Sequence, residues 1–396
     1  MTKQLMTTNI VFCWSDISGY MAACWRSLQQ QPNINLTVIA FQAHTATAFG
    51  DDLMQGIPSR LLNPDERQNA QLIKQTVLAA NPDIIVLCGW LHSPYRQLAS
   101  EPDLSHVKFV MGMDTPWQGT FKQYLAPFAL RSYLTRMDRV VVTGDRSWHY
   151  AHHLGIAPDT IHRGLYGIDY STWANLYTAR THSQNPWPRS FLFVGRYVPV
   201  KAIDILVAAY RHYRTQVSDP WNLVCCGKGD MASLLDSQPG IENRGFVQPT
   251  ALQEIWRNAG AFLLPSRFDP WPLALLEAAA AGLPIVCTNA CGSAVEVVRP
   301  WYNGLVIDED NVPALSNALL TLHHHHADLP QWGARSQHLA APYSAEIWTQ
   351  RWLALFASLD ERIPVMQIDP HPPAPSPKKG EGGSDSKSLS PSGRGI

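Results

Sequence analysis

Two cationic side chains follow a short apolar run in the second half of the chain. The segment VGRYVPVK places Arg196 in the loop after that run and Lys201 at the start of the next helical pattern. Parallel strands bind ligands at their carboxyl ends, where two fixed cations would neutralise the charge that builds up on a leaving diphosphate. A lysine in the first turn of a helix opposes the helix dipole, so its position needs a local reason. A surface arginine and a helix-start lysine without function are the alternative interpretation.

Two carboxylates lie eight residues apart in the segment PSRFDPWPLALLEAAAAGLP. Asp269 lies in a loop after an apolar run, and Glu277 lies about two turns into an Ala-rich helix. The free amides at the start of that helix suit a phosphate group. A helix-capping role would account for Asp269 alone. It would not account for Glu277, because a carboxylate in an otherwise apolar helix needs partners such as ligand hydroxyls.

Three short turns contain small residues that let the backbone approach a ligand closely. They are CGKGD (residues 226–230), GFV (245–247) and NACGSAVEVV (289–298). Each of them, taken alone, is equally consistent with a plain turn.

Taken together and in this order, these segments resemble the donor domain of retaining GT-B glycosyltransferases of family 4. The resemblance covers about residues 191–307. In the first half of the chain it is limited to the loop 15–19 and to GLYGID (164–169), which looks like the family's Asn-Gly-Val-Asp turn. It implies transfer of a sugar from a UDP-, GDP- or ADP-sugar to a hydroxyl acceptor, with retention of configuration, in polysaccharide biosynthesis. The acceptor would be a glycan, a lipid-linked sugar or a small molecule, and no metal or other cofactor would be obligatory.

The resemblance also implies roles for individual residues. Arg196 and Lys201 would hold the donor diphosphate, and the family's Glu-x7-Glu pair falls on Asp269 and Glu277. Asp269 would bind sugar hydroxyls near the reacting carbon, and Glu277 would bind the ribose. The other donor-binding residues implied are Gly195, Gly227, Phe246, Val247, Leu273, Ala274, Gly292, Ser293 and Ala294.

The sequence departs from the family pattern at a few positions. Asp269 is one methylene shorter than the usual glutamate, and Pro270 and Pro272 stand where the family often has glycine. Many members have a histidine where this chain has Met113, which is followed by Asp114. We expect either that Asp114 takes over part of the role of that histidine or that the activity is altered.

The acceptor side is expected in the first half of the chain. The loop 15–19 and the segment 112–125 would line it, with Asp16, Gly19 and Asp114 as the candidate residues. The helix expected after Trp117 mixes aromatic residues with Lys122, Arg131 and Arg136. We interpret it as an ordinary amphipathic surface helix. Peripheral contact with a membrane that carries a lipid-linked acceptor is the alternative.

Short apolar runs alternate with helical patterns along almost the whole chain, which is typical of parallel sheets covered by helices. The fold class is therefore α/β, and the resemblance makes it GT-B, with two Rossmann-like doubly wound domains facing a central cleft. We expect an acceptor-side domain over 1–170, a linker over 171–189 and a donor domain over 190–343. A helix near 344–360 would pack back on the first domain, and a tail over 366–396, rich in Pro, Gly, Ser and Lys, would be disordered.

Bulk composition excludes several classes of protein. Lys and Arg total 31 against 32 Asp and Glu, so no strong overall field would recruit nucleic acid or anionic lipid. We recognise no signal peptide in MTKQLMTTNIVFCW and no apolar stretch long enough to span a bilayer. The seven cysteines are scattered, and we interpret them as reduced thiols of a cytoplasmic protein. Neither they nor the histidines at 323–326 form a convincing metal site.

Two other classes of protein stay open. Met113 and Asp269 are compatible with a non-catalytic or partner-dependent protein that binds nucleotide sugars. A GT-B-fold epimerase or phosphorylase is the second, although no setting for a pyridoxal lysine stands out. The sequence does not indicate an oligomeric state.

Overall fold

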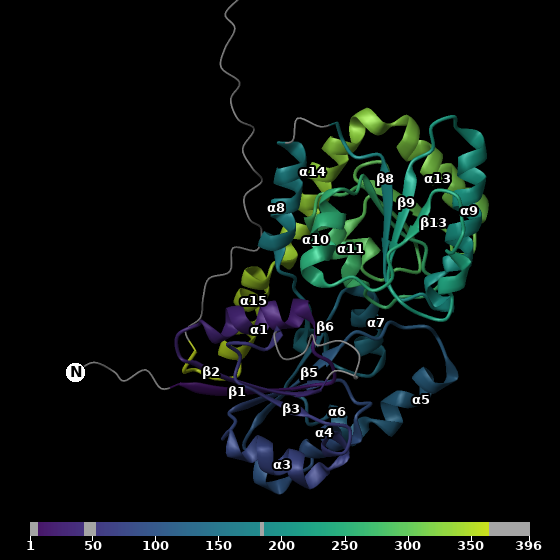
Figure 1. Cartoon of the computed structure of the whole chain (residues 1–396). Helices are drawn as coiled ribbons and strands as arrows, with labels where there is room; N and C mark the ends of the chain where they lie inside the picture. The colour runs from purple at the N-terminus through teal and green to yellow at the C-terminus, as the bar shows by residue number, and fades with distance from the viewer. Residues whose placement is uncertain (1–6, 43–52, 183–185, 364–396) are drawn as a thin grey trace, which may run out of the picture. The chain divides into compact units, whose positions relative to one another are not determined.

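The computed structural model describes residues 7–42, 53–182 and 186–363, all within one compact unit (Figure 1). The predicted disordered tail over 366–396 lies outside these residues. In the described part of the chain two parallel sheets follow one another, with helices between the strands. The predicted α/β class is confirmed.

The first sheet has seven parallel strands in the order β3-β2-β1-β4-β5-β6-β7. The order reverses between β1 and β4, which creates a switch point where ligands bind in such sheets. The strands are β1 (Thr8–Trp14), β2 (Ile34–Phe41), β3 (Ser59–Leu62), β4 (Ile84–Cys88), β5 (Lys108–Met113), β6 (Arg139–Val142) and β7 (Ile161–Arg163). The helices are α1 (Gly19–Gln29), α3 (Ala70–Ala79), α4 (Ser93–Leu98), α5 (Phe121–Ala129), α6 (Arg131–Leu134) and α7 (Asp145–His153).

The second sheet has six parallel strands in the order β10-β9-β8-β11-β12-β13, with its switch point between β8 and β11. The strands are β8 (Ser190–Val194), β9 (Asn222–Cys226), β10 (Ile241–Asn243), β11 (Ala261–Leu264), β12 (Ile285–Thr288) and β13 (Gly304–Ile307). The helices are α8 (Tyr170–Thr181), α9 (Ile203–Gln216), α10 (Pro249–Arg257), α11 (Leu273–Ala280), α12 (Ala294–Val297), α13 (Val312–His324) and α14 (Leu329–Ala340).

The last described helix, α15 (Ala345–Ala357), lies beside α1 on the first sheet (Figure 1). Trp348 and Trp352 of α15 belong to the same buried cluster as Phe12 of β1. The indole nitrogen of Trp348 donates to the carbonyl of Leu165 at 2.9 Å, so the helix is fixed by polar as well as apolar contacts.

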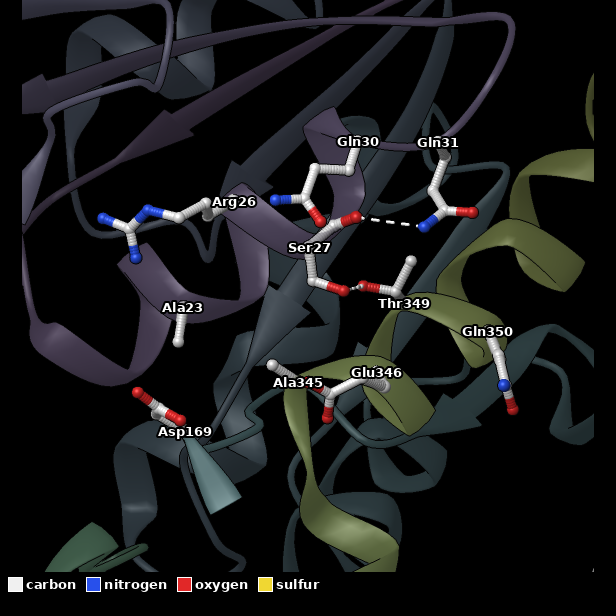
Figure 2. Close-up of a pocket in the computed structure, with 10 residues that line it drawn as sticks. All are labelled: Ala23, Arg26, Ser27, Gln30, Gln31, Asp169, Ala345, Glu346, Thr349 and Gln350. Atoms are coloured by element: carbon white, nitrogen blue, oxygen red, sulfur yellow. Dashed lines mark hydrogen bonds between the residues drawn. The ribbon is translucent and has the colours of Figure 1, made fainter. Parts of the chain in front are cut away.

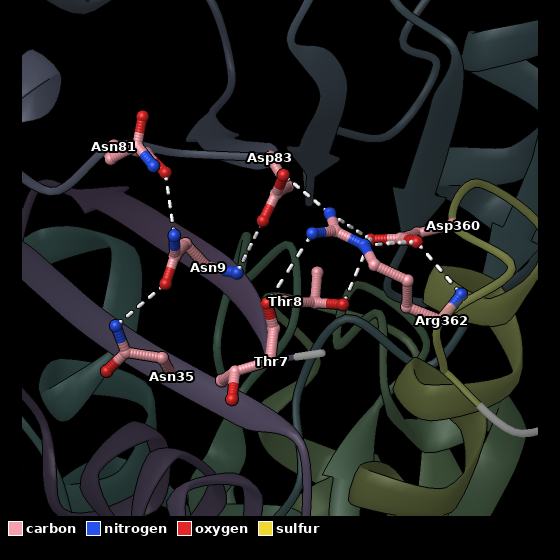
Figure 3. Close-up of polar contacts among 8 residues, drawn as sticks. All are labelled: Thr7, Thr8, Asn9, Asn35, Asn81, Asp83, Asp360 and Arg362. Atoms are coloured by element: carbon pink, nitrogen blue, oxygen red, sulfur yellow. Dashed lines mark hydrogen bonds and ion pairs between the residues drawn. The ribbon is translucent and has the colours of Figure 1, made fainter. Parts of the chain in front are cut away.

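A polar network joins the end of the described chain to the first strand (Figure 3). The Arg362 guanidinium contacts Asp83 at 2.5 Å and Asp360 at 2.7 Å, and Asp83 accepts a hydrogen bond from the Asn9 amide. Thr8 donates its hydroxyl to Asp360 at 2.9 Å. These contacts fix the segment after α15 against β1.

Most of the region expected to be a polar linker is helical. Asp169 caps α8 by accepting from the amide of Thr172, and the helix extends to Thr181. Near its end, the buried Arg180 donates to the carbonyls of Trp256 at 2.7 Å and Ala281 at 2.8 Å. These carbonyls belong to the C-terminal ends of α10 and α11, where a cation is favourable. Arg180 therefore holds α11, the helix of Glu277, in place.

We predict that Arg180→Ala lowers the free energy of unfolding by on the order of 3 kcal/mol, because several buried carbonyls lose their donor. Chemical denaturation measures this change. Arg189→Ala is the control, since the Arg189–Asp219 pair is 58% and 75% exposed and should contribute less than about 1 kcal/mol. Equal effects of the two substitutions would contradict the assigned role of Arg180.

Candidate functional site

The loops at the carboxyl ends of β8, β9 and β10 touch one another through their backbones. The Gly195 amide donates to the carbonyl of Cys226 at 3.0 Å, and the Gly227 amide donates to the carbonyl of Gly245 at 2.8 Å. A Cβ atom at Gly227 would lie 1.8 Å from the Gly195 carbonyl oxygen. Gly227 is therefore required for the packing of these loops, and its predicted role in donor binding stays a prediction.

Lys201 and Asp269 form an ion pair that brings the ends of β8 and β11 together. Their side chains are only 15% and 13% exposed. Lys201 lies in a short 3-10 turn, and α9 begins two residues later, after Ala202 in the left-handed conformation with φ 55°. The expected conflict with the helix dipole is therefore avoided.

Asp269 does not cap a helix. The N-cap residue of α11 is Pro272, which makes no side-chain capping bond. The capping interpretation of Asp269 is thus wrong, because its carboxylate is bound to Lys201 instead.

Arg267 joins the loop that contains Asp269 to the segment that contains Lys201. Its guanidinium binds both carboxylate oxygens of Asp204, at 2.6 and 3.0 Å, and contacts Asp310 at 2.6 Å. It also donates to the carbonyl of Pro199, and its amide donates to the carbonyl of Val200. Sequence analysis missed this residue, although its position two residues before Asp269 offered a signal.

Arg196 stands apart from the ion pair. It is exposed, and no hydrogen bond or ion pair joins its side chain to another residue in the described ranges. Its neighbour Tyr197 is buried and fixes the loop, because its amide donates to the carbonyl of Lys228 at 2.8 Å. The structure therefore pairs Lys201 with Asp269 but does not bring Arg196 to either of them.

Glu277 has no hydrogen-bonding or ion-pair partner among the described residues. It is half-buried in α11, and burial raises its pKa to about 7. On the facing side, burial raises the pKa of Tyr20, and the charges of Asp114, Asp16 and Glu277 raise it further. Tyr20, which directly follows the predicted Gly19, therefore lies within electrostatic reach of carboxylates from both halves of the chain.

The turn over 289–294 packs against the loop of Asp269. The Gly292 amide donates to the Asp269 carbonyl at 2.8 Å, and a Cβ atom at Gly292 would lie 1.7 Å from the Pro270 carbonyl oxygen. Ser293 is fully buried and donates its hydroxyl to the Pro272 carbonyl at 2.9 Å. The predicted residues Gly292, Ser293 and Ala294 thus lie beside the start of α11, which is formed by Leu273 and Ala274.

Phe246 and Val247 follow the third glycine of this edge. Gly245 adopts a positive φ of 61°, and Phe246 is 39% exposed. The ammonium of Lys228 lies 5.0 Å from the centroid of the Phe246 ring. An exposed aromatic face next to a cation is suited to a nucleobase. The predicted role of this segment in binding the base stays a prediction.

Asp114 follows the buried Met113 at the end of β5. Its carboxylate accepts a hydrogen bond from the Tyr166 hydroxyl at 3.1 Å. Burial raises the pKa of Asp114, and the charge of Asp269 adds to the effect. Asp114 and Asp269, from opposite halves of the chain, are therefore close enough to interact.

The other two acceptor-side candidates are less enclosed. Asp16 is exposed, and Gly19 is the first residue of α1, directly after the capping residue Ser18. Sequence analysis missed Tyr166, which lies in GLYGID and positions Asp114.

A cavity of about 350 Å³ lies elsewhere, between α1 and α15 (Figure 2). Polar side chains line it, and inside it the Thr349 hydroxyl donates to that of Ser27 at 2.8 Å. None of the predicted site residues lines this cavity. Within the described ranges, no group of three or more His, Cys, Asp or Glu could hold a metal ion, and no helix is long and apolar enough to cross a bilayer.

Residues 180–338, which include all of the second sheet, match the family model described as Glycosyl transferases group 1. An uncharacterized glycosyltransferase of Methanocaldococcus jannaschii is 29% identical over 137 residues, which make up 32% of this chain and 34% of the relative. Sucrose-phosphate synthase 4 of Arabidopsis thaliana is 44% identical over 66 residues, 17% of this chain and 6% of the relative. The match thus spans 34% of the length of the first of these curated relatives and 6% of the second.

Solved structures resemble nearly the whole chain. HepE of Anabaena in complex with UDP superposes with a TM-score of 0.69 at 16% identity, covering 89% of this chain and 100% of HepE. Sucrose-phosphate synthase of Thermosynechococcus elongatus gives a TM-score of 0.65 at 14% identity, with coverages of 88% and 98%. The likeness to these GT-B structures confirms the predicted fold.

Glu277 provides a prediction about pH. Its pKa is raised from the ordinary 4.5 to about 7, so the unfolded chain releases this proton at lower pH than the folded chain does. Stability therefore falls as the pH rises between these two values. We expect Glu277→Gln to be more stable than the wild type above pH 7, by up to about 3 kcal/mol, and to match it below pH 4.5.

Urea denaturation across this pH range, without ligand, measures the difference. Glu254→Gln in α10 is the control, because Glu254 is exposed and paired with Arg257, and it should show no gain above pH 7. A gain for Glu277→Gln that is independent of pH would contradict the assigned burial of the charge.

Proposed function

We propose that the protein is a glycosyltransferase that moves a sugar from a nucleotide-diphospho-sugar to a hydroxyl acceptor. The observation that carries this proposal is the arrangement of four charged groups. Lys201, Asp269 and Asp114 follow the carboxyl ends of strands from the two sheets, Lys201 pairs with Asp269, and Asp269 interacts with Asp114. Tyr20 lies within electrostatic reach of both Asp114 and Glu277 of α11. The match of residues 180–338 to the group 1 family model supports it. Because HepE was crystallised with UDP, a UDP-sugar is the first donor to test, ahead of GDP- and ADP-sugars.

In the proposed reaction, a bond forms between the acceptor oxygen and the anomeric carbon of the donor sugar. The bond between that carbon and the diphosphate oxygen breaks, and the electron pair leaves with the nucleoside diphosphate. The acceptor's hydroxyl proton passes to the departing phosphate on the same face, so configuration is retained. The products are the glycoside and the protonated nucleoside diphosphate.

Arg196 and Lys201 supply the positive charge that stabilises the leaving diphosphate. Arg196 is exposed, and its side chain has no hydrogen-bonding or ion-pair partner in the described part of the chain, so it can bind a phosphate without first giving up such a contact. Lys201 is paired with Asp269, and a phosphate that binds it would free the Asp269 carboxylate for sugar hydroxyls. Glu277 would receive its missing partners from the ribose. No metal ion is needed for these steps, and activity that a chelator abolishes would contradict this part.

The donor site predicts a specific pattern of ligand stabilisation. A nucleotide sugar at one hundred times its dissociation constant should stabilise the wild type by about 2.7 kcal/mol. We expect this from one nucleotide family among UDP-, GDP- and ADP-sugars, with the effect lost in Arg196→Ala and Glu277→Ala. Thermal denaturation with each ligand measures it. Arg189→Ala removes an exposed arginine directly before β8, serves as control and should respond as the wild type does.

A lack of stabilisation by any donor would contradict the proposal. A non-catalytic nucleotide-sugar-binding protein is the second candidate, favoured by the buried Met113 at the position of the family's histidine. This candidate predicts the same stabilisation without turnover. Release of nucleoside diphosphate above background in the absence of acceptor would favour the enzyme, and conversion to another nucleotide sugar would indicate an epimerase.

We further propose that the protein is cytoplasmic and that α5 contacts the anionic inner face of the cell membrane. An ordinary amphipathic helix buries its apolar side, but in α5 the only buried residue is Gln123. Phe121, Tyr124 and Phe128 are 76%, 60% and 80% exposed. The apolar side chains of α5 are therefore exposed and not buried against the protein as they are in an ordinary amphipathic surface helix.

The charges beside this apolar side identify the partner. Residues 115–137 contain no acidic side chain. Lys122 and Arg131 are exposed, and neither forms a hydrogen bond or ion pair with another described residue. Exposed apolar side chains flanked by free cations are typical of helices that lie on anionic lipid.

We predict that the protein sediments with phosphatidylcholine vesicles that contain phosphatidylglycerol, and less with vesicles of phosphatidylcholine alone. Replacing both Phe121 and Phe128 by Ser should weaken this binding at least about tenfold, since burying one Phe contributes about 1.5–3 kcal/mol. Leu234→Ser is the control, because Leu234 is an exposed apolar residue outside α5. Equal binding of the double variant and the wild type would refute the contact.

A further inference from the structure

A second cavity, of about 440 Å³, lies at the carboxyl ends of β1, β4 and β5, beside the switch point of the first sheet. Its volume falls in the range of roughly 300–1,000 Å³ that is typical of small-molecule sites. Gly112 lies in its wall, where a Cβ atom would approach Leu165 to 2.7 Å and Trp14 to 3.3 Å. The side chains of the wall are thus closely packed around this glycine.

Aromatic rings form much of the lining. Trp14, Phe41, Trp90 and Tyr166 all face the cavity. Phe41 stacks on the buried Tyr95 with ring centroids 5.5 Å apart, and Trp14 meets Tyr166 edge-on at 6.4 Å. The rings are therefore held by neighbours, and they offer flat apolar faces of the kind on which the C–H face of a sugar ring packs.

The charge of the lining is negative. Among the described residues that line it, Asp114 is the only Asp, Glu, Lys or Arg, and His92 is the only histidine. The two ring nitrogens of His92 are used by the Tyr95 amide and the Arg67 carbonyl, and burial lowers its pKa, so the ring is neutral. Asp114 therefore carries the formal charge of the cavity.

Further carboxylates lie near the cavity, and one of them, Asp269, is paired with Lys201. Asp269 interacts with Asp114, and Asp16 and Glu277 lie within reach of the nearby Tyr20. The cations nearby belong to residues outside the described lining. Lys201 is bound to Asp269, the Arg96 guanidinium lies 3.5 Å from the Trp90 carbonyl oxygen, and the Arg67 guanidinium lies 5.6 Å from the centroid of the Phe41 ring.

We infer that this cavity binds a neutral sugar unit as the acceptor and excludes anionic sugars such as sugar phosphates and uronates. The aromatic rings pack on the sugar, and the Asp114 carboxylate, held by the Tyr166 hydroxyl, accepts hydrogen bonds from sugar hydroxyls. A phosphate or a second carboxylate would meet Asp114 with no cation in the lining to compensate it. The inference names the acceptor class of the proposed transferase and so rests on the proposed function.

The test measures the binding of free sugars to the full-length protein by isothermal titration calorimetry, with and without UDP. Glucose, galactose and mannose are the neutral probes, and glucose 6-phosphate and glucuronate are the anionic ones. We expect at least one neutral sugar to bind, and the anionic sugars to bind at least about tenfold more weakly, because like charges repel in the enclosed site.

A charge variant makes the test specific to this cavity. Thr115 lies in the lining and is half-buried, so Thr115→Arg places a cation beside Asp114. It should shift the ratio of anionic to neutral binding by at least about tenfold toward the anionic sugars. Gln216→Arg adds the same charge at an exposed position of α9 and should leave the ratio unchanged. Trp90→Ala should weaken neutral-sugar binding without changing the stabilisation by UDP.

A wild type that prefers anionic sugars, or that binds no sugar of either class, would overturn the inference. So would an unchanged ratio in a folded Thr115→Arg variant. The thermal denaturation with UDP-, GDP- and ADP-sugars tests the proposed function separately. If no nucleotide sugar binds but neutral sugars do, the proposed transferase function is refuted and the sugar site in the cavity is not. If a nucleotide sugar binds but neutral sugars do not, only the inferred acceptor class is refuted.

Discussion

The arrangement of the candidate donor site depends on the guanidinium of Arg267. It joins the loop after β11 to Asp204 at the start of α9, to the Pro199 carbonyl and to Asp310 after β13. Asp204 and Asp310 are 43% and 55% exposed, so these ion pairs contribute little to the free energy of folding. Their effect is geometric, because a bidentate guanidinium–carboxylate contact fixes both distance and orientation. Lys201 and Asp269 lie on the two loops so joined, and their ion pair follows from that constraint.

The charged groups of the candidate site are compensated by burial, by water and by other groups of the protein. Lys201 is neutralised by Asp269, and burial raises the pKa of Glu277 to about 7, so this carboxyl is about half protonated at pH 7. Arg196 remains in water, where an unpaired charge costs little. In the proposed function, contacts with the phosphate, sugar and ribose of a nucleotide sugar replace the internal contacts of these groups. Part of its binding energy is then used to separate Lys201 from Asp269, which favours ligands that offer Asp269 new hydrogen bonds.

The sequence predicted the strands that are buried on both faces, because runs such as those of β4, β11 and β12 are continuous and mostly apolar. It missed β3, β7 and β10, which have three or four residues and carry polar side chains. It also interpreted α8 as linker, since its polar residues hide the contacts of Arg180 with helices 70 to 100 residues away. The candidate site residues were found by motif, but the Lys201–Asp269 pair, the contacts of Arg267 and the outward apolar side of α5 depend on tertiary contacts that no local pattern contains.

At Met113 and Asp114, tertiary contacts determine what the absence of the family's histidine implies. At Met113 the chain is still in β5, and the side chain is buried in the core on one face of the sheet. One residue later the strand has ended, and the Asp114 carboxylate reaches Tyr166 and the field of Asp269. If the proposed function is correct, the polar group that meets the acceptor has therefore moved one position along the chain. An aspartate can accept hydrogen bonds from sugar hydroxyls but brings negative charge, and this exchange is what restricts the cavity to neutral acceptors.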